Sequence, residues 1–266
     1  MNSDMKAYTF LSFMTRAPIE SRDFADKHLS IWGKYFPAIP ATRFLDANEK
    51  QFLVSEFREQ FYDEWAGVCT TWVGEKKRMY GSKDPACKSL HGTVRIYTKA
   101  NGSSQTQYTA FMKEWAAVSV VDLATLVVFN EEVPEPERTL GAFYAVELPY
   151  GLPAVPWAAC FGKPYIEMFS REKLDAAPFA VREWLSDDLV YCQLTENCFD
   201  YVNNHSSYLE RQEAVMQILG RDCFRDAAHP SKRVRVPVFP GLDIPAPTAA
   251  IPFPPAIALS DSKREI

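Results

Sequence analysis

Residues 155–174 read VPWAACFGKPYIEMFSREKL, and three local patterns meet in this stretch. The short apolar run around Cys160 predicts a buried strand. The Gly-Lys-Pro step at residues 162–164 predicts a turn, because proline fixes φ and glycine has no Cβ. The aromatic run that follows predicts a short helix, which places the stretch in the middle of a mixed fold. The residues expected in the core are Trp157, Cys160, Phe161 and Tyr165.

Downstream, two apolar stretches at residues 179–184 and 189–194 predict a β-hairpin. The four residues between them, Leu-Ser-Asp-Asp at 185–188, are typical of a hairpin loop. Three further stretches rich in β-branched and aromatic residues predict strands at 93–99, 126–129 and 142–148.

Four segments have the apolar spacing of an amphipathic helix. In residues 46–65 apolar side chains recur every four residues, and Asp46 with Glu49 matches a capping box. The other three are residues 106–118, residues 207–219 with a Ser207–Glu210 capping box and Gly220 as the stop, and residues 21–35. This order of helices and strands favours an α+β fold, with a mostly antiparallel sheet packed with helices.

The sequence changes character near its C-terminal end. Eight of the nineteen prolines fall within residues 230–255, and proline can continue neither a helix nor a central strand. We expect residues 229–266 to be an extended Pro-rich tail that wraps the domain at least as far as Ile244 or hangs free. Residues 1–228 are expected to form a single α+β domain, or two subdomains that meet near residues 130–140.

Composition narrows the classes of function. With 47% hydrophobic and 24% charged residues the chain reads as an ordinary globular protein, and its net charge of −5 argues against nucleic acid as a partner. The longest apolar run, residues 118–129, is interrupted by Asp122, so no membrane span is expected. Residues 1–20 lack a basic n-region and a cleavage site, which predicts a cytoplasmic location.

Two groups of residues are candidates for catalysis. Cys160 is the candidate nucleophile of a cysteine-dependent hydrolase, although its apolar neighbours favour a buried structural thiol. Cys192, Cys198 and His205 are candidate ligands of a metal-dependent hydrolase, but their spacings differ from those of zinc-binding units. Phosphate-binding glycine loops and Gly-x-Ser-x-Gly are absent from the sequence. We therefore expect no catalytic residue, metal or cofactor, and six free buried thiols.

Acidic residues gather in two loops, at residues 130–137 (NEEVPEPE) and residues 183–188 (EWLSDD). Pro134 and Pro136 break any regular element in the first loop, so it reads as exposed. Solvated loops are the default interpretation. The sharper hypothesis is a docking surface for a basic partner.

Residues 152–195 resemble a segment of bacterial immunity proteins that accompany polymorphic toxins and type VI secretion effectors. The matching features are Pro156-Trp157, Phe-Gly-Lys-Pro-Tyr at 161–165, Ser-Arg-Glu-Lys-Leu at 170–174, Ala177-Pro178 and Gln-Leu-Thr at 193–195. The run Leu-Gly-Arg-Asp-Cys-Phe-Arg-Asp at 219–226 is similar too. The likeness lies mainly in residues 152–226, about the C-terminal half of the chain.

The resemblance implies an immunity protein that acts in bacterial competition. Such a protein binds and neutralises a cognate toxin, delivered by type VI or contact-dependent secretion, by occluding it, and performs no chemistry itself. A cytoplasmic immunity protein implies a toxin that acts there, such as a nuclease, whose basic cleft acidic loops would mimic. The expected toxin-binding residues are Glu131, Glu132, Glu135, Glu137, Asp187 and Asp188, with Trp184 or Tyr165 as aromatic anchor.

A third interpretation is a scaffold. Residues 237–240 and 252–255 both match Pro-x-x-Pro, the form in which proline-rich segments bind partner domains. The toxin, its target and the oligomeric state are not specified by the sequence.

Overall fold

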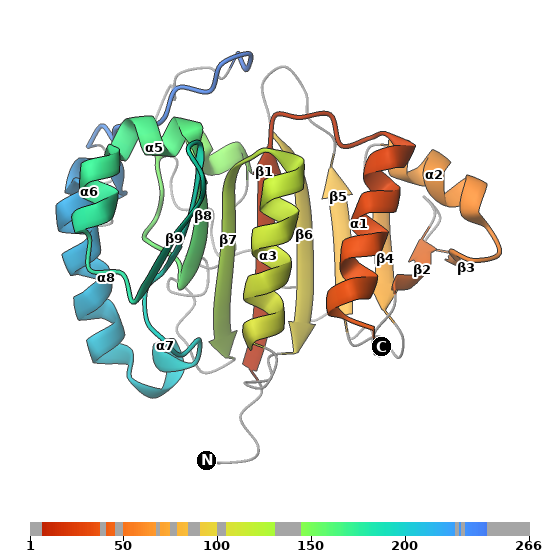
Figure 1. Ribbon diagram of the computed structural model, residues 1–266, viewed down its shortest axis with the longest axis horizontal. Coiled ribbons are helices and arrows are strands. Elements are labelled where there is room, and N and C mark those ends of the chain that lie inside the picture. The colour runs from red at the N-terminus through yellow and green to blue at the C-terminus, as the bar shows by residue number, and fades with distance from the viewer. Residues whose placement is uncertain are drawn as a thin grey trace.

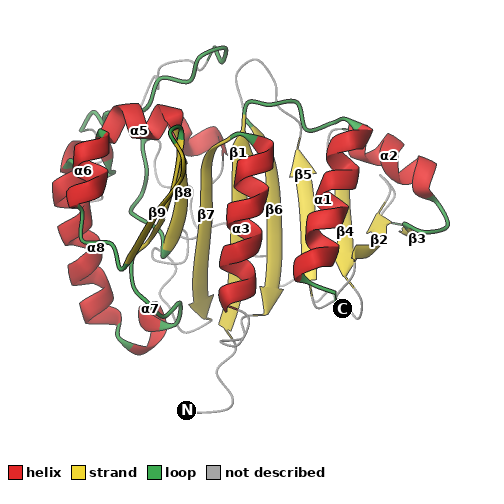
Figure 2. Cartoon of the chain, in the orientation of Figure 1, coloured by secondary structure: helices red, strands yellow, loops and turns green. Residues whose placement is uncertain are grey.

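The computed structural model has one antiparallel sheet with helices packed against it (Figures 1 and 2). The structure describes residues 7–37, 41–45, 50–67, 70–74, 79–84, 91–99, 105–130, 145–226, 229 and 232–243. Within these residues the sheet has ten strands in the order β3-β2-β4-β5-β6-β1-β7-β8-β10-β9. Neighbouring strands run antiparallel throughout, which confirms the predicted α+β class.

The strands are β1 (Ala7–Thr15), β2 (Ala41–Leu45), β3 (Gln51–Leu53), β4 (Thr70–Gly74), β5 (Met79–Asp84), β6 (Gly92–Lys99), β7 (Val121–Asn130), β8 (Ala158–Gly162), β9 (Val181–Ser186) and β10 (Leu189–Gln193). The α-helices are α1 (Arg22–Tyr35), α2 (Arg58–Ala66), α3 (Gln105–Ser119), α5 (Lys163–Phe169), α6 (Arg171–Ala176), α7 (Asp200–Asn203) and α8 (His205–Leu219). In the described part of the chain, 3-10 helices span Ala145–Tyr150 and Arg221–Cys223. None of the described helices is long and apolar enough to cross a membrane.

Strand β1 lies at the centre of the sheet, between β6 and β7. Its residue Phe13 pairs with Val94 on one side and Ala124 on the other, and its ring lies 4.2 Å from the Trp115 ring of α3. Helices α1 and α3 cover this face of the sheet (Figure 1). The first strand of the chain therefore connects the sheet's two halves and supports the main aromatic core.

The helix predicted over residues 46–65 is wrong in its first half. Helix α2 begins only at Arg58, Gln51–Leu53 form β3, and residues 46–49 lie outside the described part of the chain. The Phe52 ring stacks on the Phe44 ring across the β2–β3 pair, with centroids 5.5 Å apart. A cross-strand contact thus outweighs the helical spacing.

Other local predictions fare differently. The expected strands at 93–99 and 126–129 lie within β6 and β7, and the helices at 106–118 and 21–35 lie within α3 and α1. Helix α8 starts at His205, so the expected cap at Ser207 lies inside it, whereas Gly220 ends it with φ of 111° as expected. The strand expected at 142–148 is wrong, because Ala145–Tyr150 is a 3-10 helix with Pro149 inside; residues 142–144 are not described.

The stretch at residues 155–174 forms the predicted strand, β8, and a helix, α5, but the strand passes directly into the helix at Lys163 without a separate turn, and a second helix, α6, follows. Gly162 is required at this junction, because a Cβ there would lie 2.1 Å from the Val121 carbonyl oxygen. The residues buried in this stretch include Trp157, Cys160, Phe161 and Tyr165.

Residues 232–243 of the Pro-rich tail run along the domain, in blue at the top of Figure 1. The Arg235 backbone N–H donates to the Asp222 carbonyl at 2.8 Å, and Phe239 is buried. The described part of the tail therefore wraps the domain. The rest of the tail and the proposed boundary at 131–140 lie outside the described residues.

Candidate functional site

The β9–β10 hairpin at one end of the sheet carries three of the predicted binding residues: Trp184, Asp187 and Asp188. Trp184 is half-buried, and its Nε1 donates a hydrogen bond of 3.0 Å to Asp175 Oδ1. The Arg171 guanidinium lies 3.9 Å above the indole ring. These contacts from α6 fix the orientation of the indole at the edge of the sheet. We call Arg171, Trp184, Asp187 and Asp188 the hairpin surface.

The carboxylates of the hairpin surface are open to solvent. Asp187 is fully exposed, and its closest ion-pair contact among the described residues is Arg171 at 3.7 Å. Asp188 lies 3.6 Å from Lys163, and both side chains are more than half exposed. Exposed pairs at such distances contribute little to stability. Both charges therefore stay available to a basic partner.

The other predicted binding residues lie elsewhere. Glu131, Glu132, Glu135 and Glu137 fall outside the described residues. Tyr165 is 1% exposed and packs between aromatic rings in the core, and burial raises the pKa of its hydroxyl well above the ordinary value. The Phe239 ring of the tail lies 6.1 Å from it, so Tyr165 is covered in the folded chain and is not the exposed anchor that was predicted.

The four described cysteines are buried free thiols, while Cys69 and Cys87 are not described. Burial raises the pKa of Cys192 and Cys198 to about 12, and that of Cys160 further still. Because the thiolate is the reactive form, a raised pKa does not favour a nucleophile at Cys160.

The Cys192, Cys198 and His205 group is not assembled as a metal site in the part of the chain that the structure describes. The ring Nδ1 of His205 lies 2.9 Å from the Tyr201 carbonyl oxygen, and the ring packs edge-on against the Tyr201 ring. These two contacts link His205, the first residue of α8, to Tyr201 of α7.

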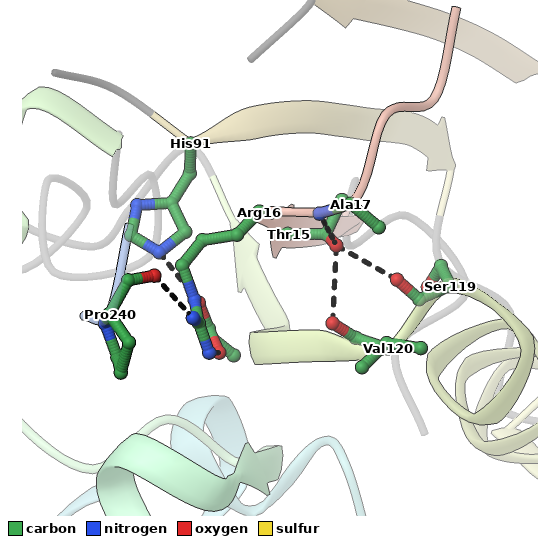
Figure 3. A network of polar contacts seen from close by, with 8 residues as sticks. Thr15, Arg16, Ala17, His91, Ser119, Val120 and Pro240 are labelled. Carbon is green, nitrogen blue, oxygen red and sulfur yellow. Dashed lines mark hydrogen bonds and ion pairs between the residues drawn. The ribbon is translucent and has the colours of Figure 1, made fainter. Parts of the chain in front are cut away.

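A charged cluster that sequence reasoning missed is formed by Arg16, His91 and Asp122 (Figure 3). Arg16 follows β1, Asp122 is the second residue of β7, and His91 precedes β6. Arg16 donates through Nε and Nη2 to the two carboxylate oxygens of Asp122, at 2.5 and 2.9 Å. His91 Nε2 lies 2.9 Å from Asp122 Oδ2, and because a carboxylate accepts, this nitrogen is the donor.

The environment keeps Asp122 charged. Burial alone would raise the pKa of this carboxyl, but the hydrogen bonds from His91 and Arg16 outweigh burial and lower it. The same carboxylate raises the pKa of Arg16. The side chains of Asp122 and His91 are almost completely buried, whereas that of Arg16 is 28% exposed. The cluster is therefore a preformed ion pair with one cationic face toward the surface.

The tail covers this cluster. Arg16 Nη1 donates to the Pro240 carbonyl at 2.6 Å, and the Phe239 ring lies edge-on to the His91 ring at 4.5 Å. The Pro-x-x-Pro segment at 237–240 thus contacts its own domain. This segment is therefore not the free ligand that the scaffold interpretation requires.

Backbone strain lies next to the cluster. Val120 has a φ of 50° and is 72% exposed, a conformation that β-branched residues rarely adopt. The Thr15 hydroxyl contacts the carbonyls of Ser119 and Val120 at 2.8 and 3.1 Å, and accepts from the Ala17 N–H at 3.0 Å (Figure 3). These contacts of the Thr15 hydroxyl hold the strained turn that precedes β7.

One sequence signal could have revealed the cluster. Asp122 is a carboxylate inside an otherwise apolar run, and a buried charge needs a partner. The partners themselves are remote, since Arg16 lies 106 residues away and His91 lies 31 residues away.

No protein-family model and no curated protein matches the chain. Among solved structures it is similar to a Pseudomonas aeruginosa T6SS protein at 10% sequence identity, with a TM-score of 0.45. The match covers 79% of this chain and 73% of that chain. Likeness at this identity and score is loose and carries no argument about function.

Proposed function

We propose that the chain is an immunity protein that binds a cognate bacterial toxin and occludes it, with the hairpin surface as the contact region. One observation carries this proposal: Trp184 stands at the sheet edge, half-exposed and oriented by Arg171 and Asp175, beside the exposed Asp187. Interface hot spots favour Trp and Arg, and a side chain that is already ordered loses little entropy on binding. The resemblance of residues 152–226 to immunity proteins supports the same role.

The charge of the hairpin surface indicates the kind of toxin. Asp187 and Asp188 lie in the hairpin turn, where their ion-pair contacts among the described residues are with the exposed Arg171 at 3.7 Å and Lys163 at 3.6 Å. A basic cleft, such as that of a cytoplasmic nuclease delivered by type VI or contact-dependent secretion, would complement them. Such complementarity accelerates association and makes it sensitive to salt.

The test begins with the gene beside the one that encodes this chain. If that gene encodes a secreted protein with a C-terminal toxin domain, this domain is expressed in a sensitive bacterium with and without the chain. We expect the wild-type chain to restore growth and to form a complex with the purified domain. Absence of a toxin gene, or of protection by the wild-type chain, would overturn the immunity role.

Variants locate the surface. Asp187→Lys and Trp184→Ala are expected to weaken the complex by about tenfold or more each, as loss of hot-spot contacts does. The matched control is Asp63→Lys, because Asp63 is an exposed carboxylate on α2, at the far end of the sheet (Figure 1). If all three chains bound with wild-type affinity, the hairpin surface would be the wrong contact region even though the immunity role stood.

A further inference from the structure

The tail segment formed by residues 235–243, here named the strap, lies over charged groups. Beneath it are the Arg16–Asp122 ion pair and His91, with Tyr165 close by. The strap also covers part of the core, because Phe239 belongs to the hydrophobic core and Leu242 packs against it. The charged groups beneath it are a feature that a segment sealing only a core would not need.

Two contacts of the strap are those that a bound peptide makes. The Phe239 ring is 6% exposed and lies 4.5 Å from the His91 ring and 6.1 Å from the Tyr165 ring. The next residue, Pro240, presents its backbone carbonyl to Arg16 Nη1 at 2.6 Å. A buried aromatic side chain beside a main-chain hydrogen bond is how grooves read extended peptides.

Arg16 is prepared for this contact. Asp122 holds Nε and Nη2 of the guanidinium, which leaves Nη1 as the donor that reaches the Pro240 carbonyl. The His91 Nδ1 atom is buried and has no hydrogen-bond partner among the described residues, the strap included. The strap therefore leaves one buried polar atom of this cluster without a hydrogen bond among the described residues.

The strap has no regular secondary structure. Pro237 and Phe239 are buried and Leu242 packs against the core, but Val238, between the two buried side chains, is 79% exposed. Arg235 adds an exposed ion pair with Asp222 and a hydrogen bond to the Met168 carbonyl. Segments without helix or strand open locally at less than the cost of global unfolding. Pro237 and Pro240 also keep the released strap extended, which lowers the entropy cost of rebinding.

We propose that Arg16, His91, Asp122 and Tyr165 form a peptide-binding surface for extended segments that contain a Phe-Pro step. The strap occupies this surface in cis through Phe239-Pro240, and a partner protein with the same step competes for it. This role is separate from the hairpin surface and does not depend on the immunity function.

The direct test uses a fluorescent peptide with the sequence of residues 232–243, KRVRVPVFPGLD, and the full-length chain. The Phe239→Ala chain is expected to bind this peptide at least about tenfold more tightly than the wild-type chain, because its own strap competes less. A control peptide with alanine in place of the phenylalanine is expected to bind the Phe239→Ala chain at least about tenfold more weakly. Equal binding of both peptides, or none, would overturn the proposal.

A second variant tests the Arg16 contact. In the Phe239→Ala background, Arg16→Gln is expected to lower peptide affinity by about tenfold, as loss of a charge-assisted hydrogen bond does. The control in the same background is Arg233→Gln, an exposed cation outside the strap. Equal affinity of both double variants would overturn the assignment of Arg16 as the carbonyl donor.

Hydrogen exchange on the wild-type chain keeps the test independent of any variant's folding. Amides of the strap, such as Leu242, are expected to exchange faster than those of β1, and excess peptide is expected to accelerate the strap further. Strap amides as protected as β1, or unchanged by the peptide, would show that the strap is a fixed part of the domain and would overturn the proposal.

Discussion

Two buried histidines lie in very different surroundings, His28 in the aromatic core and His91 in the charged cluster under the strap. His28, on α1, packs against the rings of Trp32, Trp65 and Trp115 and accepts a hydrogen bond of 3.0 Å from Trp115 Nε1. His91 lies instead beside a charged carboxylate. The first region packs a polar ring inside an aromatic core, whereas the second holds charged groups under the strap.

The difference between the two histidines separates a region that stabilises the fold from a region that carries charged groups near the surface. Burial lowers the pKa of His28 to about 3, so the ring stays neutral and acts as a packing element. The ion pair beside His91 joins residues that are remote in the sequence. The strained turn at Val120 lies next to it, and the strap covers it. A buried ion pair is weak evidence for stability, because the cost of desolvating two charges can exceed their attraction. The regions should therefore respond differently to substitution.

The largest effect is expected in the aromatic core. Trp115 is fully buried and contacts Phe13 and Phe24, so Trp115→Ala should lower the free energy of unfolding by about 3–5 kcal/mol in urea titrations. Phe239→Ala, in the strap, should cost only about 2 kcal/mol because the strap opens locally. Equal costs would erase the distinction between the regions.

The pH dependence of stability tests the neutral His28. Its folded pKa of about 3 lies below the unfolded value near 6.5, so the unfolded chain takes up the proton first. The contribution of His28 is complete above pH 6.5 and falls by about 1.4 kcal/mol per pH unit toward pH 3. His28→Gln should remove this slope, whereas the exposed His229→Gln should not, as measured by urea unfolding from pH 7 to 4. The same slope in both variants would mean that His28 is not the titrating group.

Asp122→Asn tests the charged region. Loss of the ion pair should cost about 2 kcal/mol, reduced from that of a fully buried pair because Arg16 is partly exposed. Asp122 has a lowered pKa, so its contribution is complete above the unfolded value near 3.8 and is lost as the pH falls through the folded value. The variant should therefore lose less stability than the wild type in acid below pH 4. A loss equal to that of the wild type would indicate that Asp122 does not hold its proton off in the folded state.

The smallest effect concerns the strained turn. Val120→Gly should raise the free energy of unfolding by about 0.5–1 kcal/mol, because glycine adopts a φ of 50° without strain. Val118 is also exposed but lies inside α3, so Val118→Gly should lower it by a similar amount. The opposite signs, read from thermal melts, isolate backbone strain from loss of a side chain.

Local patterns predicted those elements whose own residues decide their conformation. Residues 106–118 were predicted to be an amphipathic helix, and in α3 the side chains of Tyr108, Phe111, Met112 and Trp115 from this range are buried. The hairpin β9–β10 and the strand-to-helix junction at Gly162 followed from loop composition and from the absence of a Cβ. The hairpin surface was likewise visible in the sequence as an exposed acidic turn beside Trp184.

The remaining features depend on contacts between distant residues. Residues 51–53 form a strand because β2 pairs with them, and β1 is central because β6 and β7 flank it. Tyr165 was a candidate anchor until the packing of α5 buried it.

The sequence by itself determined the α+β class, the amphipathic helices α1, α3 and α8, and the exposed acidic hairpin, because periodicity and turn chemistry act over a few residues. Only the tertiary structure decided the strand order, the Arg16–Asp122–His91 cluster and the course of the strap. These depend on which buried groups find partners across as many as 224 residues, as Arg16 and Pro240 do. A buried charge in a sequence signals that a partner must exist, and the fold alone supplies it.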